Sequence, residues 1–181
     1  MAYSDVFSEL SAHFVKGMMF HDQMANYYQF LALKGYAQYH NFQFHCDSDN
    51  YRKLNEFYIS HYNRLIMNKS VSDPKAIPET WYRYTRDDVD SDTKRTAIKN
   101  GIAEWINWET ATLSKLQQSQ LELYDDSEVA SAMLIYEFIQ DVEKELRCAK
   151  QMYLDLNAVD FDMEYILDKQ TPLYEKYTDM L

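Results

Sequence analysis

Five ionisable side chains are predicted to lie on or beside the apolar faces of long helices, where charged groups are unusual. Glu109 is the central one, because it falls on an apolar stripe between Trp105 and Leu113. Burial of an unpaired carboxylate costs several kcal/mol, so an inward Glu109 requires a counter-charge, a hydrogen-bonding partner or a proton of its own. The others, each on or next to the stripe of its own helix, are His21, Asp22, His61 and Glu145.

A divalent metal ion is one partner that satisfies such a set of side chains. Carboxylate oxygens together with one or two imidazoles suit iron, manganese or zinc. In this interpretation His61, Glu109 and Glu145 are metal ligands, and His21 or Asp22 completes the site from the first helix. The sequence therefore predicts a partial metal site between helices, with iron or another divalent ion as the expected cofactor.

Each of these residues also has a purely structural interpretation. A single histidine on an aromatic face is more often a hydrogen-bonded core residue than a ligand, and this applies to both His21 and His61. Glu109 can instead pair with a histidine, a tyrosine hydroxyl or Arg64, and Glu145 can form a solvated ion pair with basic residues of its own helix. Both interpretations stay open at the level of sequence.

Composition excludes several other kinds of chemistry. The chain has 3 glycines and 3 prolines in 181 residues, too few for glycine-rich phosphate loops or for the many turns of a β-sandwich or barrel. Cys46 and Cys148 have no C-x-x-C spacing, which indicates a reducing, cytoplasmic setting. No nucleophile has a base placed beside it, so the pattern indicates neither a hydrolase nor a transferase, and enzymatic activity is left open. The net charge of -11 argues against binding to nucleic acid or to an anionic membrane.

The spacing of the apolar residues predicts an all-α protein, expected to form a single helical domain over 1–181. A helix over 5–45 would be about 60 Å long, so a break or bend is expected near Gly17 or Gly35. Residues 69–92 have no sustained periodicity and predict a long crossover loop, which gives a four-helix bundle with one long crossover between the second and third helices. The expected helices are roughly 5–45, 50–68, 93–124, 126–157 and 160–180, the last broken at Pro172.

The register of the first helical hairpin decides whether the two histidines can meet. The polar run 47–50 predicts the turn between the first two helices. With the turn there, His21 and His61 lie almost four helical turns apart, about 20 Å, and they meet only if the first helix ends near His40.

This layout resembles the ferritin-like superfamily over roughly residues 18–156. The resemblance implies two metal ions inside the bundle, held by a Glu from each of two helices and a Glu-x-x-His from each of the other two, and iron oxidation, iron storage or a related oxidase reaction. At the corresponding spacing this chain has Tyr58-x-x-His61 and Glu137-x-x-Gln140. The stretches 21–28 and 58–65 also look like those of uncharacterised phage-borne and Gram-positive bacterial proteins.

A second hypothesis comes from another class of function. The net charge of -11 and the incomplete ligand set are typical of a metal-free acidic bundle that binds a basic protein partner, for example a phage accessory or inhibitor protein. Several apolar residues of the first helix lie off its main stripe, which places that helix either centrally in the bundle or in a homodimer interface. These residues are Phe20, Tyr27, Phe30 and Leu31.

Overall fold

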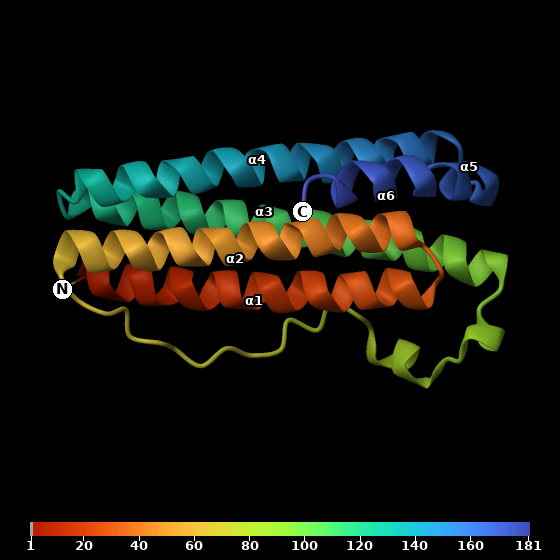
Figure 1. Ribbon diagram of the computed structural model, residues 1–181, viewed down its shortest axis with the longest axis horizontal. Coiled ribbons are helices and arrows are strands. Elements are labelled where there is room, and N and C mark those ends of the chain that lie inside the picture. Colours follow the sequence, from red (N-terminus) through yellow and green to blue (C-terminus); the bar gives the residue numbers. More distant parts are fainter. Residues whose placement is uncertain (1) are drawn as a thin grey trace.

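The computed structural model describes residues 2–181 as an all-α bundle of four long helices with two short helices at its C-terminal end (Figure 1). The long helices are α1 (Ala2–Phe30), α2 (Lys34–Tyr62), α3 (Ser91–Asp125) and α4 (Val129–Ala158), followed by α5 (Met163–Asp168) and α6 (Gln170–Thr178). Two 3-10 turns, η1 (Glu79–Arg83) and η2 (Arg86–Asp88), lie in the crossover. The predicted layout of two hairpins joined by one long crossover is confirmed.

The first hairpin turns earlier than the sequence predicts. The expected helix over 5–45 is two helices, because the chain reverses at Leu31, Ala32 and Leu33. Ala32 adopts a left-handed conformation with φ of 61°, and the Leu33 N–H donates to the Tyr28 carbonyl at 2.8 Å, a helix-ending pattern that usually contains glycine. The predicted turn over 47–50 is wrong, since those residues lie inside α2.

Neighbouring elements within the chain bury the off-stripe side chains of α1. Tyr27 packs edge-on against Trp81 of the crossover, with ring centroids 5.2 Å apart, and Phe20 stacks on Trp108 of α3 at 4.9 Å. Gln23 of α1 forms two hydrogen bonds with the crossover. Its amide donates to Asp73 at 2.8 Å, and its carbonyl oxygen accepts from the Ala76 N–H at 3.0 Å. The crossover and α3 therefore cover two of the apolar side chains that lie off the main stripe of α1, Tyr27 and Phe20.

A layer of polar side chains divides the core of the bundle into two apolar clusters. Along α1 the buried positions recur every three or four residues, and Gly17 and His21 occupy the middle of this series, between Phe14 and Met24. Similar polar positions lie midway along the other three long helices. We call this layer the polar belt; its members are Gly17, His21, His40, Gln43, Asp47, Asn50, Glu109, Thr112 and Glu145. One apolar cluster contains Trp105 and the α5–α6 end, and the other contains Leu10 and the α3–α4 turn.

The C-terminal helices fold back over the space between α2 and α4 (Figure 1). The Gly35 N–H donates to the Gln170 side-chain oxygen at 2.8 Å. Further along α2, Tyr39 and Phe42 pack on Tyr177, with ring centroids 4.6 and 5.4 Å apart. Among the helices that the structure describes, none has the length and apolarity needed to cross a membrane.

Candidate functional site

Glu109 of α3 lies in the polar belt and is only 2% exposed. The indole N–H of Trp105, one turn earlier on the same helix, donates to its Oε1 at 3.1 Å. The Nε2 atom of His21 faces the same oxygen from α1 at 3.4 Å. The positive charge that a buried Glu109 requires is thus available within the chain, from the imidazolium form of His21.

A second histidine, His40 of α2, holds His21 in this orientation. The two Nδ1 atoms are 3.0 Å apart, so one imidazole donates a hydrogen bond to the other. Burial, with a smaller contribution from His21, lowers the pKa of His40 well below its ordinary value. The ring of His40 stacks on Tyr28 at 5.4 Å and meets Trp105 edge-on at 5.3 Å. The lowered pKa favours the neutral form of His40.

Asp47 of α2 brings a second carboxylate to the same imidazole, with its Oδ2 3.9 Å from His21 Nε2. The side chain as a whole is 17% exposed, but this oxygen is buried and has no hydrogen-bond partner within residues 2–181. Room for it comes from Gly17 of α1, where a Cβ would overlap the Asp47 carboxylate. Burial, and next the charge of Glu109, raise the pKa of Asp47 well above its ordinary value.

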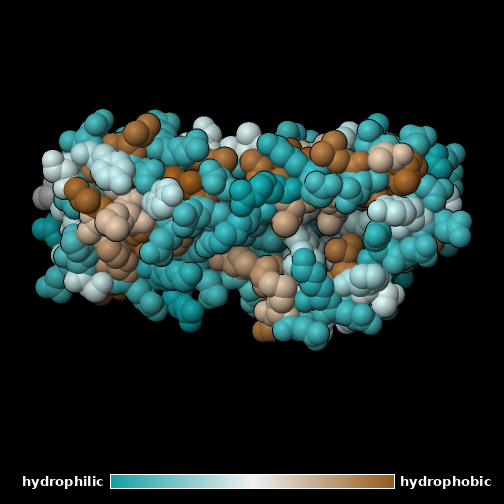
Figure 2. Space-filling model, turned by 90° about the horizontal axis from the view of Figure 1, so that it is seen from above, coloured by the Kyte–Doolittle hydropathy of each residue, from teal (hydrophilic) through white to brown (hydrophobic). Residues whose placement is uncertain are grey.

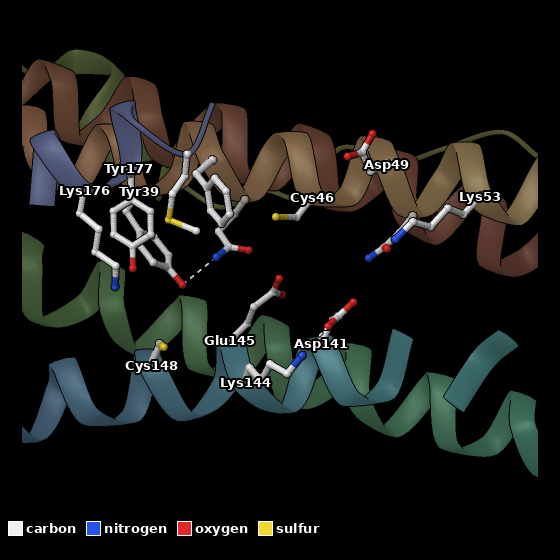
Figure 3. A pocket seen from close by; sticks show the side chains of 14 residues that line it. Tyr39, Cys46, Asp49, Lys53, Asp141, Lys144, Glu145, Cys148, Lys176 and Tyr177 are labelled. Atoms are coloured by element: carbon white, nitrogen blue, oxygen red, sulfur yellow. Dashed lines mark hydrogen bonds and ion pairs between the residues drawn. The ribbon is translucent and has the colours of Figure 1, made fainter. Parts of the chain in front are cut away.

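Glu145 contributes the fourth helix to this group. It is half-buried on α4 and points into the space between α4 and α2 (Figure 3). Burial raises its pKa well above the ordinary value, with Glu109 and Asp47 adding to the effect. Three carboxylates therefore interact with one another in the belt. Their mutual repulsion has to be offset, either by protonation of some of them or by a nearby cation.

The structure brings only part of the predicted site together. His21 and Glu109 are in contact, and Glu145 lies within their electrostatic reach. The prediction that His61 faces the core is wrong, because it is exposed near the end of α2 and stacks on Phe57 at 5.1 Å. Asp22 is also exposed, and accepts a hydrogen bond from Asn26 at 3.2 Å.

Sequence reasoning missed two members of the site, His40 and Asp47. The polar run 47–50 is typical of a loop, which puts Asp47 in a turn and His40 near the end of a helix. A signal was present: His40, Gln43, Asp47, Asn50 and Leu54 follow one another at alternating spacings of three and four residues, as the buried face of one continuous helix does.

The donor set of this cluster fits a divalent cation, although its arrangement is not that of a finished metal centre. Two ligand atoms bound at about 2.1 Å to one ion lie within about 4.2 Å of each other, and His21 Nε2 is 3.4 Å from Glu109 and 3.9 Å from Asp47. Among the described residues, no three of the His, Cys, Asp and Glu side chains are already placed to hold an ion. Binding of a metal ion therefore requires side-chain movements. The Oδ2 atom of Asp47 makes no hydrogen bond within the described residues that such a movement would break.

Comparison with known proteins by sequence gives no relatives: no family model matches the chain, and no curated protein matches it. Comparison of structures identifies similar proteins. A humanized archaeal ferritin is similar over 96% of this chain and 95% of its own, with a TM-score of 0.79 and 12% identity. An open pore ferritin from the hyperthermophilic archaeon Archaeoglobus fulgidus gives the same coverage and TM-score at 11% identity. A PmFTN variant soaked in iron covers 94% of this chain and 97% of its own, with a TM-score of 0.76 and 9% identity.

These similarities agree with the four long helices and the single crossover. They give no support to the likeness to phage-borne and Gram-positive bacterial proteins. The chain therefore has the ferritin-like fold.

Proposed function

We propose that this protein binds a divalent metal ion, iron(II) above all, in the polar belt. The observation that carries the proposal is the buried, unpartnered Oδ2 of Asp47, which lies beside an imidazole nitrogen that also faces Glu109. A carboxylate oxygen in that setting needs a proton or a cation. The crystal structure of a structural neighbour soaked in iron supports iron as the first ion to test.

The residues of the belt have distinct roles in this proposal. His21, Asp47 and Glu109 hold the ion, and Glu145 approaches from the space between α2 and α4. His40 fixes the ring of His21 through the contact between the Nδ1 atoms, which leaves Nε2 directed at the carboxylates. An iron ion in such a set of oxygen and nitrogen ligands supplies one-electron redox chemistry. Metal binding would compete with protons for Asp47 and Glu145, whose pKa values burial raises.

Metal affinity of the purified protein tests this function directly. Metal-free protein is titrated anaerobically with Fe(II), and with Co(II), whose visible spectrum reports ligand type and number. We expect one tight site per chain in the wild type and an affinity at least about tenfold lower in Glu109→Gln and in Asp47→Asn.

The matched controls are Asp22→Asn and His61→Gln, which remove an acid and an imidazole from exposed positions outside the belt. They should bind metal as the wild type does. Equal affinity in all five proteins, or no binding by the wild type, would contradict the proposal.

A second candidate function, binding of another protein, is favoured by an exposed apolar strip at the opposite end of the bundle from α5. Val129, Met133 and Tyr136 follow one another at helical spacing on α4 and are 54%, 61% and 51% exposed. Figure 2, viewed from above Figure 1, shows hydrophobic side chains gathered at this end. Such a strip on an otherwise acidic surface suits a partner with an apolar contact ringed by basic residues.

Capture experiments with a charge variant test this candidate. Immobilised wild-type protein should retain a partner at low salt and release it at high salt. Met133→Glu should abolish retention, whereas Met180→Glu, at a position 53% exposed near the C-terminus, should not. Identical retention by the two variants would exclude the α4 strip as the binding surface.

A further inference from the structure

An elongated groove runs between α2 and α4 on the side of the bundle where α6 folds back. α2 and α4 approach each other less closely than the two helices of either hairpin, and α6 fills only part of the space between them. The remaining cavity has a volume of about 460 Å³, within the range of pockets that hold small organic ligands. Its walls come from α2, α4 and the C-terminal segment (Figure 3).

The two ends of the groove differ in chemical character. Most side chains at the end next to α6 are aromatic or apolar, including Phe42, Met180 and the Tyr39–Tyr177 pair, and Lys176 at this end lies over the Tyr177 ring. Of the side chains labelled in Figure 3, Lys53 lies farthest along α2 from Tyr177. Between Phe42 and Lys53 the helix advances by about 16 Å. The groove is therefore shaped for a molecule with a long apolar body and a polar end.

Three acids line the groove, namely Asp49, Asp141 and Glu145, and two of them are paired with cations. Asp49 is paired with Arg52 at 3.1 Å, and Asp141 is paired with Lys144 at 2.9 Å. Lys53 has no carboxylate partner anywhere in the described chain, although its side chain lines the groove.

A second donor lies beside this lysine. Asn50 precedes Lys53 by one helical turn on the same face of α2, is only 6% exposed, and its side-chain amide makes no hydrogen bond to another described residue. The ammonium group of Lys53 and the side-chain amide of Asn50 therefore both line the groove, and both can donate hydrogen bonds.

We propose that the groove binds an amphipathic monoanion, an aliphatic carboxylate of medium chain length. The hydrocarbon chain lies against Phe42, Tyr177 and Met180, and the carboxylate accepts hydrogen bonds from Lys53 and Asn50. The groove shares Glu145 with the polar belt, but His21, Asp47 and Glu109 do not line it, so this proposal does not depend on the function proposed above.

Isothermal titration calorimetry with decanoate, in buffer containing EDTA and below the concentration at which decanoate forms micelles, tests the site. We expect one decanoate per chain and no binding of decyltrimethylammonium, which has the same alkyl chain and the opposite charge. Lys53→Glu should weaken decanoate binding about tenfold or more and leave the affinity for decanol unchanged. Phe42→Ser should weaken the binding of both.

The matched control is Lys150→Glu, an equal change of charge at an exposed position of α4 that does not line the groove. Both lysines are exposed, so circular dichroism spectra of the two variants should match that of the wild type. No decanoate binding by the wild type would overturn the proposal. Equal affinity for the cationic amphiphile, or equal weakening in Lys53→Glu and Lys150→Glu, would do the same.

Discussion

Replacement of His21 by leucine should lower the free energy of unfolding by about 3–5 kcal/mol, the usual cost of removing one partner from a buried ion pair. The imidazole of His21 is 3.4 Å from Glu109, and within residues 2–181 the other bond of that carboxylate is to the indole of Trp105. Leucine fills a similar space but leaves Glu109 without a positive partner inside the belt. Chemical denaturation of the metal-free protein at neutral pH measures the change.

The double variant His21→Leu/Glu109→Leu provides the control for this prediction. With both charges removed, the belt gains apolar contacts in place of an unpaired carboxylate, and most of the lost stability should return. The difference between the single and double variants gives the coupling between the two side chains. A His21→Leu protein within about 1 kcal/mol of the wild type would show that Glu109 does not depend on His21 for its charge.

Gly35→Ala should detach α6 from α2 and destabilise the protein by about 1–3 kcal/mol, as overpacking of a close contact does. A Cβ on Gly35 would overlap the backbone carbonyl of Gln170, which cannot rotate away as a side chain can. The helix has to move, and the hydrogen bond from the Gly35 N–H to Gln170 is lost with it. Hydrogen exchange should show faster exchange in α6 than in the wild type.

Gly17→Ala is the matched comparison for this change. The added Cβ there meets the carboxylate of Asp47, the movable end of a side chain, so the cost should be smaller and α6 should exchange as in the wild type. Equal protection of α6 in the wild type and in Gly35→Ala would contradict the prediction.

The fold could be predicted from the sequence wherever helix signals and core periodicity agreed. The third and fourth helices were predicted within about three residues at each end, and their hairpin follows from the apolar spacing. The first hairpin could not be placed, because its turn is made by Ala32 and its buried neighbours Leu31 and Leu33, which have no turn-forming tendency of their own. Tertiary packing determines the position of that turn, and the local sequence does not indicate it.

The misplaced turn explains one of the errors in the site. The apolar series around Glu109 is correctly placed on α3, so its inward position follows from the sequence. The expected turn over 47–50 puts Asp47 in a loop, whereas it lies within α2. His61 has a different cause: it follows Phe57 by one turn on the apolar stripe, but near the end of α2 Phe57 is only half-buried and His61 is exposed. Polar residues at core spacing are ambiguous in the sequence, since a turn and a buried polar layer use the same residue types.

The polar belt divides the core into two apolar clusters, so the apolar contacts that hold the helices together lie apart from the ionisable side chains. Each apolar cluster joins residues from all four long helices, one set around Trp105 and the other around Leu10. The two ends therefore hold the helices in register independently of the ionisation state midway between them.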